Sequence, residues 1–235
     1  MSRLTHQEKR HVDSLEAIRH CELLEVQVSA LGELGRPFDA MPPPHEYDAD
    51  WSGVEYDPDL AHLMPRFEEI SASWTTRPPL PKFGGEFSVA HLAYVLSQQV
   101  GPWVNQEPTE FRRQFMASLR CIDSTPNSGS GRMSFLRMRS HVSPLEIWYS
   151  DIADIGGEPY PPGYVKLDLS YSQYLEALLL TKGMFGWQYL YAEMSLRGTS
   201  WSDVRNRLKV MVDVFPEIFP QYDYTELRER LEARL

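Results

Sequence analysis

The sequence predicts an α+β fold in which an antiparallel sheet packs against helices, with a helix at the N-terminus and helices at the C-terminus. Three observations predict it. Apolar residues recur at helical spacing near both ends of the chain, short β-prone runs separated by turn formers occupy its middle, and two capping boxes mark helix starts. With 235 residues, 42% of them hydrophobic, the chain can bury a substantial core.

The first predicted element is a long helix. Thr5-x-x-Glu8 has the form of a capping box, and apolar residues follow at roughly helical spacing until Gly32 or Gly35. We therefore assign residues 1–36 to an N-terminal helical segment. Residues 37–59 are rich in Pro and Asp without periodicity and are predicted to form an acidic connecting loop. Residues 60–235 form a single α+β domain.

Helices and a strand are predicted in the next stretch. Apolar residues follow helical steps from Leu60 to Ser73, and "RPPLP" at 77–81 then stops the helix. The β-prone run "EFSV" follows Gly84-Gly85 and precedes a helix with Leu92, Val95 and Leu96 on one face. A further helix is expected from Glu107 to Leu119, and "TPNSGSG" at 125–131 has the composition of a flexible loop.

The last third of the chain carries the clearest pattern. Three β-prone runs at 132–139, 145–150 and 164–169 indicate strands of an antiparallel sheet. Ser170-x-x-Gln173 caps a helix that should pack on this sheet and end at Gly183. Two more helices are expected, from Ser202 to about Phe215 and from Thr225 to the end.

Composition indicates a cytoplasmic protein. The two cysteines, Cys21 and Cys121, provide no disulfide framework, the charged N-terminus has no signal-peptide pattern, and no run of eighteen apolar residues occurs. We expect no membrane contact. The net charge of −10 disfavours direct nucleic-acid binding, which depends on Lys and Arg. Nearly all of the excess, −9, lies within residues 37–110.

The motifs of common enzyme classes are not found. The sequence has no His-Glu-x-x-His, Gly-x-Ser-x-Gly, phosphate-binding glycine loop or EF-hand loop. The seven histidines are scattered, and each cysteine is most simply a small buried apolar residue. We therefore expect no catalytic residues, no metal and no cofactor.

The acidic run "EYDADWSGVEYDPD" is the candidate functional segment. Seven carboxylates and no Lys or Arg lie between Arg36 and Arg66, interleaved with aromatic residues. Such a run could hold a metal ion or be a solvated loop, but acidic groups also steer a basic partner and aromatic rings supply binding energy. The predicted partner-binding residues are Glu46, Tyr47, Asp48, Asp50, Trp51, Glu55, Tyr56, Asp57 and Asp59.

The aromatic stretch "GMFGWQYLYAEM", residues 183–194, has two interpretations. A platform for stacking nucleic-acid bases would need exposed rings and basic neighbours, yet no Lys or Arg lies between Lys182 and Arg197. After a capped amphipathic helix, the Trp and at least two other rings are expected to close the core.

The block "LDLSYSQYLEALLLTKGMFGWQYLYAEM" resembles the closing segment of the SMI1/KNR4 (SUKH) superfamily. The matching residues are Tyr174, Leu175, Gly183, Phe185, Gly186, Trp187, Gln188, Tyr189 and Leu190, and "GGEF" at 84–87 with Leu92 is similar to the start of the family's central strand. The resemblance spans residues 55–220. No Asn precedes Gly84-Gly85, in contrast to the usual family pattern.

This resemblance implies a curved sheet backed by helices and an immunity protein as the leading function. Such a protein would bind a cognate secreted polymorphic toxin of interbacterial competition and occlude its active site, without catalysis of its own. The partner would be a basic toxin catalytic domain, of the nuclease or nucleotide-modifying type. Two alternatives stay open: a metal-assisted hydrolase using the acidic 46–59 segment, and a non-enzymatic regulatory scaffold.

Overall fold

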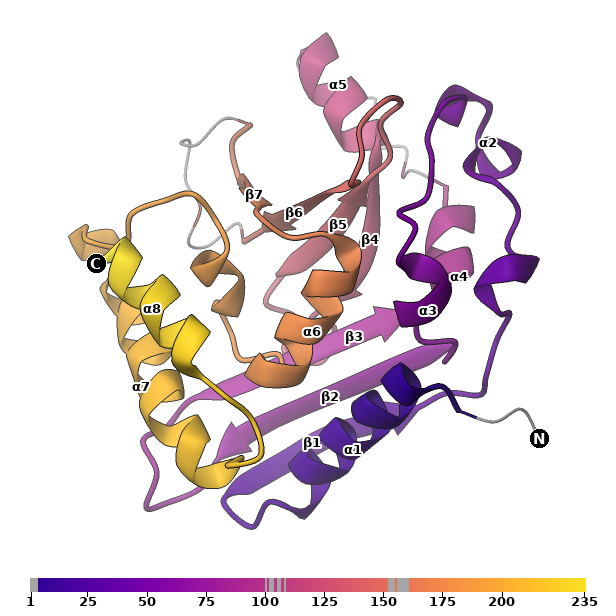
Figure 1. The fold of residues 1–235 in the computed structure, drawn as a ribbon. Helices are drawn as coiled ribbons and strands as arrows, with labels where there is room; N and C mark the ends of the chain where they lie inside the picture. Colours follow the sequence, from indigo (N-terminus) through magenta and orange to yellow (C-terminus); the bar gives the residue numbers. More distant parts are fainter. Residues whose placement is uncertain are drawn as a thin grey trace.

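The computed structural model describes residues 4–99, 101, 104, 107, 109–151, 155 and 161–235. Within them the α+β prediction is confirmed. Seven antiparallel strands form one open sheet in chain order, β1 to β7, and helices stand at both ends of the chain (Figure 1). In this described part, no helix has the length and apolar character needed to span a membrane.

The strands are β1 (Leu24–Leu31), β2 (Glu69–Thr76), β3 (Gly84–Ala90), β4 (Leu119–Ser124), β5 (Met133–Arg137), β6 (Glu146–Ser150) and β7 (Tyr164–Leu167). The α-helices are α1 (His6–His20), α2 (Pro44–Tyr47), α3 (Leu60–Leu63), α4 (Leu92–Ser97), α5 (Glu110–Ala117), α6 (Tyr171–Thr181), α7 (Ser202–Ile218) and α8 (Thr225–Arg234). Short 3-10 turns are η1 (Phe38–Ala40), η2 (Ala49–Trp51), η4 (Trp187–Leu190) and η5 (Thr199–Trp201).

The N-terminal segment is helical only to His20, so the prediction of one helix up to Gly32 or Gly35 is wrong. The predicted capping box of Thr5 and Glu8 does begin α1. Residues 24–28, however, alternate apolar and polar side chains, which is the period of a strand, and they belong to β1, which pairs antiparallel with β2. The segment 1–36 therefore contributes a strand to the main sheet.

The predicted helix from Leu60 to Ser73 is also wrong beyond its first four residues. The helix α3 ends at Leu63, and the next residue, Met64, precedes Pro65, a position that disfavours helical backbone. The strand β2 follows. Its apolar side chains Ile70, Ala72 and Trp74 join the main core, because alternate residues of a strand face opposite sides.

The later predictions hold. The three β-prone runs form β5, β6 and β7, Ser170 and Gln173 form the capping box of α6, and both C-terminal helices are present. The helix expected at 107–119 is α5, which is shorter, and Leu119 begins β4, a strand that the sequence pattern does not predict.

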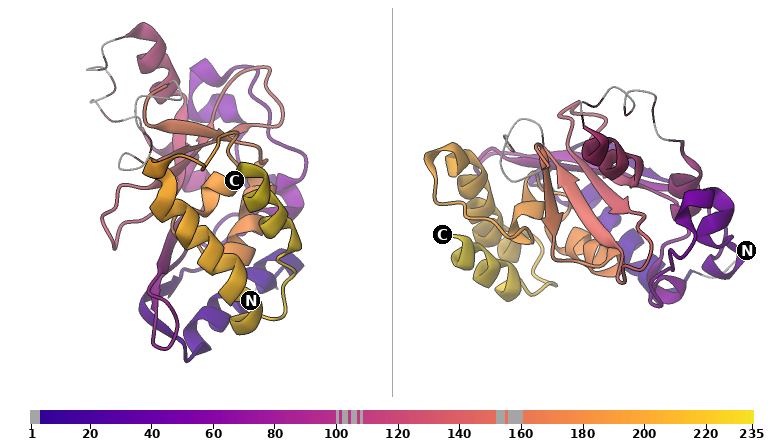
Figure 2. Two further views of the ribbon diagram at one scale, coloured as in Figure 1. Left: turned by 90° about the vertical axis from the view of Figure 1, so that its left-hand side faces the viewer. Right: turned by 90° about the horizontal axis from the view of Figure 1, so that it is seen from above.

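Helices α1, α6, α7 and α8 cover one face of the sheet (Figures 1 and 2). The main core lies between them and the sheet, with Trp74, Leu136, Tyr149 and Phe215 among its buried side chains. A smaller apolar cluster on the opposite face joins α5 to the sheet. It includes Phe115 and Met116 of α5, together with Leu119 and Tyr164.

The aromatic stretch closes the main core, as predicted. Trp187, Tyr189 and Tyr191 are buried, with exposures of 1%, 0% and 3%. Just before them the chain lies antiparallel beside β3, because Glu86 N donates to Gly183 O at 2.9 Å and Phe185 N donates to Gly84 O at 3.1 Å. The stretch thus joins the sheet to the core.

The neighbouring strands β3 and β4 are joined in the described part by one residue pair, Val89 and Asp123. Beyond this pair, residues 183–185 take the place of β4 beside β3 at one end. At the other end α4 contacts β4. The sheet therefore opens between its two parts, β1–β3 and β4–β7, which are turned relative to each other in Figure 1.

Candidate functional site

Residues 46–59, which contain the predicted partner contacts, form an ordered surface of the protein that is anchored from beneath by Trp51. This side chain is only 3% exposed, and the Arg120 guanidinium of β4 lies 4.4 Å from the centre of its ring. Arg120 Nη2 also lies 3.5 Å from Asp48 Oδ2. A cation over an indole ring, paired with a carboxylate, holds η2 against β4.

Asp57 also anchors residues 46–59 to the rest of the protein. Its side chain is 6% exposed, and Oδ1 accepts a hydrogen bond of 3.1 Å from Leu145 N, just before β6. Burial raises the pKa of Asp57, and the hydrogen bond from Leu145 opposes this shift. The carboxyl group therefore serves the fold and faces inward.

The tyrosines of the segment are half-buried. Tyr56 donates its hydroxyl hydrogen to Pro42 O at 2.8 Å, and its ring packs edge-on against Phe38 at 5.4 Å between centroids. Tyr47 packs against the main core, and burial raises the pKa of its hydroxyl. Both rings hold the segment in one shape and leave limited surface for a partner.

The nine predicted contact residues therefore divide into three groups. Trp51 and Asp57 are buried within the protein itself and present almost no surface to a partner in this conformation. Tyr47, Asp48 and Tyr56 are half-buried. The exposed members are Glu46, Asp50, Glu55 and Asp59.

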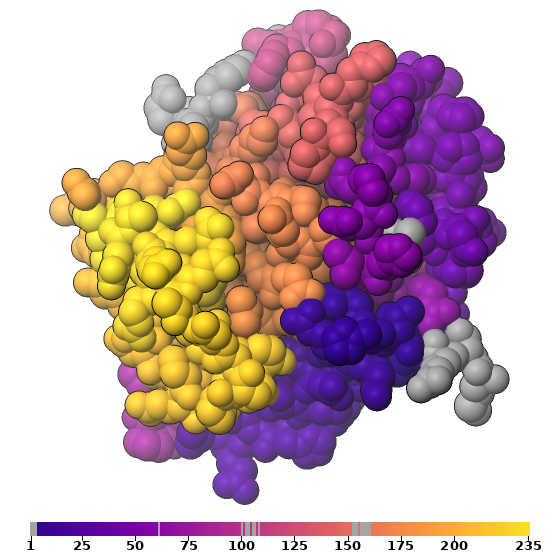
Figure 3. Space-filling model, viewed as in Figure 1, coloured from indigo at the N-terminus to yellow at the C-terminus, as the bar shows by residue number. Residues whose placement is uncertain are grey.

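These four exposed carboxylates, with Asp39, give residues 37–59 a strongly negative surface. Within the described part of the chain, no ion pair joins any of the five to a Lys or Arg. Figure 3 shows this part of the chain on the opposite side of the molecule from the C-terminal helices. We call residues 37–59 the acidic segment below.

The carboxylates of the acidic segment do not converge on a common point suitable for a cation. Asp48 is paired with Arg120, and Asp57 accepts from the main chain. Among the residues with a described structure, no group of three or more His, Cys, Asp or Glu side chains is placed to hold a metal ion. The geometry therefore gives the hydrolase alternative no support.

A hollow of about 520 Å³ lies where the acidic segment meets α4. Tyr47, Asp48 and Ala49 form one wall, the end of α4 forms the other, and Arg120 lies between them. No local sequence pattern links Arg120 or α4 with the acidic segment, so neither was predicted to lie beside it.

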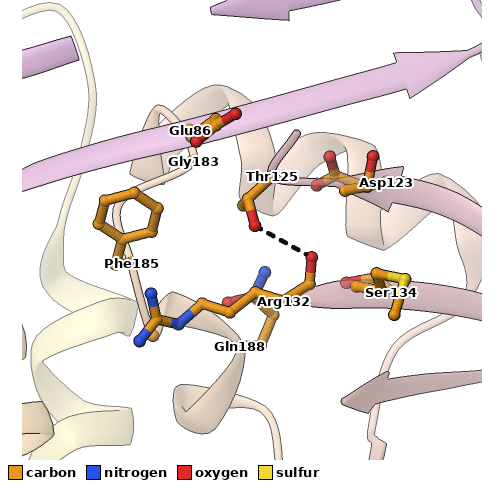
Figure 4. Close-up of a pocket in the computed structure, with 11 residues that line it drawn as sticks. Glu86, Asp123, Thr125, Arg132, Ser134, Gly183, Phe185 and Gln188 are labelled. Carbon is orange, nitrogen blue, oxygen red and sulfur yellow. Dashed lines mark hydrogen bonds between the residues drawn. The ribbon is translucent and has the colours of Figure 1, made fainter. Parts of the chain in front are cut away.

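A separate polar cavity lies at the opening between β3 and β4 (Figure 4). Its lining includes Glu86, Asp123, Arg132 and Gln188, but its volume of about 10 Å³ admits one water-sized group and no substrate. Burial raises the pKa of Asp123 to about 6, although Tyr174 donates to Oδ2 at 2.7 Å. This cluster is a buried polar connection between the sheet and α6.

Glu86 also binds the loop 125–131. Its two carboxylate oxygens accept hydrogen bonds from Asn127 N and Ser128 N, and Asn127 Nδ2 donates to Ser73 Oγ at 3.0 Å. Buried carboxylates need such donors. Loop 125–131, whose composition predicts flexibility, is therefore held to β2 and β3 by these hydrogen bonds.

His91 has a structural role as the cap of α4. His91 Nδ1 accepts from Ala93 N at the start of α4. Cys121, expected to be buried, has an exposed residue surface, yet the packing around its sulfur raises the pKa of the thiol to about 12. At neutral pH this group is a thiol and a weak nucleophile.

Comparisons with protein-family models, with curated proteins and with solved structures found no match to this chain.

Proposed function

We propose that this protein is a non-enzymatic immunity protein, which binds the catalytic domain of a cognate secreted toxin in the cytoplasm and occludes its active site. The observation that carries the proposal is the acidic segment, whose exposed carboxylates stand on a framework of buried side chains. The cognate domain is basic, of a nuclease or nucleotide-modifying type. Such a domain has a cationic cleft that an acidic surface complements.

The anchoring of the acidic segment matters for affinity. A surface that is already ordered before binding loses less conformational entropy when a partner arrives. Trp51 and Asp57 supply this order through Arg120 and Leu145. Exposed carboxylates such as Glu46 and Asp50 then attract a basic domain over several ångströms, which mainly accelerates association.

The resemblance of residues 174–190 to the SMI1/KNR4 superfamily supports the same proposal, because many bacterial members are immunity proteins. A regulatory scaffold, the other non-enzymatic alternative, is favoured by no feature of the described residues. The acidic segment specifically favours a basic protein partner.

The first test is protection of cells. The probe is the C-terminal domain of the polypeptide encoded immediately upstream of the gene for this protein. It is expressed in bacterial cells with and without this protein. We expect growth arrest that co-expression relieves, and a complex of the two purified proteins. If no secreted multidomain protein is encoded there, or if wild-type protein neither binds nor protects, the proposal is overturned.

The second test is charge reversal. Replacement of the exposed carboxylates Glu46, Asp50, Glu55 and Asp59 by Lys should slow association with the toxin domain by about tenfold or more, with little change in dissociation. Asp48 and Asp57 stay intact because they hold the fold. The matched control reverses four exposed carboxylates of α7 and α8: Asp203, Glu217, Glu229 and Glu232. Equal association rates for the two variants would place the interface elsewhere.

A further inference from the structure

A groove of about 840 Å³ lies beside α4, on the face of the sheet opposite the main core. It exists because β3 and β4 separate beyond Val89 and Asp123, and because α4 lies between α2 and β4 (Figure 1). Its floor has small side chains, among them Ser88, Ala90 and Ser124. A segment of another protein can therefore approach the sheet closely.

Tyr94 stands at the edge of this groove. Its side chain is 61% exposed, the highest value for a large hydrophobic residue in the described part. The buried residues of α4, Leu92, Val95 and Leu96, fix the opposite side of the helix in the core. An exposed aromatic ring on a fixed helix beside a groove has the character of a binding hot spot.

Carboxylates outnumber Lys and Arg both on the groove wall and on the acidic segment beside α4. Between Arg36 and Arg77 the chain has nine carboxylates and one basic residue, Arg66, whose Nε lies 2.6 Å from Glu8 Oε1. Arg36 is the one Lys or Arg that lines the groove. Seven of the nine carboxylates are exposed: Asp39, Glu46, Asp50, Glu55 and Asp59 in the acidic segment, and Glu68 and Glu69 in the groove wall.

We propose that a loop of the toxin domain carrying Lys or Arg side chains lies in this groove and packs against Tyr94. This inference rests on the proposed immunity function and extends its interface from the acidic segment across α4. The occupant is basic because the wall presents Glu68 and Glu69, and because α2, within the acidic segment, contacts α4. The carboxylates set the association rate, whereas Tyr94 and the groove set the dissociation rate.

The experiment measures binding kinetics of the purified toxin domain with two variants. Tyr94→Ala removes the exposed ring, and Ala93→Trp fills the groove. We expect each to raise the dissociation rate by about tenfold or more and to leave association within about threefold. The controls are Ala93→Ser, which leaves the groove open, and Phe111→Ala, which removes an exposed ring of α5 outside the groove. Urea unfolding of every variant confirms an intact fold.

The outcomes separate the two proposals. If wild type binds and protects while Tyr94→Ala and Ala93→Trp dissociate as slowly as wild type, the groove inference is wrong and the immunity function stands. A faster dissociation of Phe111→Ala alone would also overturn it, by moving the contact to α5. If wild type does not bind, the proposed function fails and the groove inference fails with it.

Discussion

Glu8 joins the start of α1 to the chain that leads into β2. Its side chain is fully buried and accepts hydrogen bonds from Thr5 N, Arg66 N and the Arg66 guanidinium. Burial alone would raise the pKa of Glu8, but the bonds from Arg66 and Thr5 and the charge of Arg66 lower it to about 2. The Glu8 carboxylate thus completes the capping box with Thr5 and also forms an ion pair with Arg66, which is far away in the sequence.

Glu8→Gln should lower the free energy of unfolding at pH 7 by about 3 kcal/mol, because it leaves Arg66 without its buried anion. The stabilisation by Glu8 is complete above its unfolded pKa near 4.5 and is lost as the pH falls towards about 2. The difference between wild type and variant should therefore shrink over this range. Urea unfolding at several pH values measures it.

The matched control is Glu16→Gln on the same helix. Glu16 pairs with Arg19 at 2.5 Å, but its side chain is 42% exposed. Exposed pairs contribute less than about 1 kcal/mol. A loss for Glu16→Gln as large as that for Glu8→Gln would contradict the assigned role of the buried pair.

At the scale of elements, β3 and the segment 183–185 depend on each other. A Cβ atom at Gly85 would lie 2.7 Å from Trp74 Cζ2, 2.8 Å from Gly183 O and 2.8 Å from Met184 Cα. Gly183 itself has φ +69°, a backbone conformation that favours glycine. The two glycines allow the aromatic stretch to lie against the strand and then enter the core.

Gly85→Ala should therefore destabilise the protein by at least about 2 kcal/mol, because two of the clashing atoms belong to backbone. Gly198→Ala is the control, since its nearest neighbours would lie 3.6 Å away. We expect the control to change stability by less than about 0.5 kcal/mol. Equal urea midpoints for both variants would show that the contact between β3 and Gly183 is not tight.

At the scale of the whole molecule, charge is separated from the core and from the C-terminal helices. The excess of −9 in residues 37–110 is concentrated by the fold on the acidic segment and the groove wall. Residues 111–235 have equal numbers of basic and acidic side chains. Exposed negative charge is therefore gathered on one side of the molecule.

Association with the proposed toxin partner should slow by about tenfold between roughly 20 mM and 500 mM salt, because mobile ions screen exposed charges. The variant with Lys at positions 46, 50, 55 and 59 should show a much flatter dependence. Stopped-flow mixing at several salt concentrations measures both. A salt-independent wild-type rate would mean that the negative side does not steer binding.

The parts of the fold that were predicted correctly depend on neighbouring residues. Capping boxes at Thr5 and Ser170, and the alternation within β5 to β7, act over a few positions. The candidate surface was predicted only in part. Its exposed carboxylates follow from composition, but the burial of Trp51 depends on Arg120, and the groove depends on where β3 and β4 separate.

The sequence by itself determined the fold class, the starts of α1 and α6, the closing role of the aromatic stretch and the location of the negative charge along the chain. Only the tertiary structure decided that residues 24–31 form a strand, that Asp57 faces inward, and that α4 and Tyr94 border a groove. The physical reason is distance along the chain. A strand needs a partner strand, and a buried carboxylate needs a donor, and here β2 and Leu145 provide them from far along the sequence.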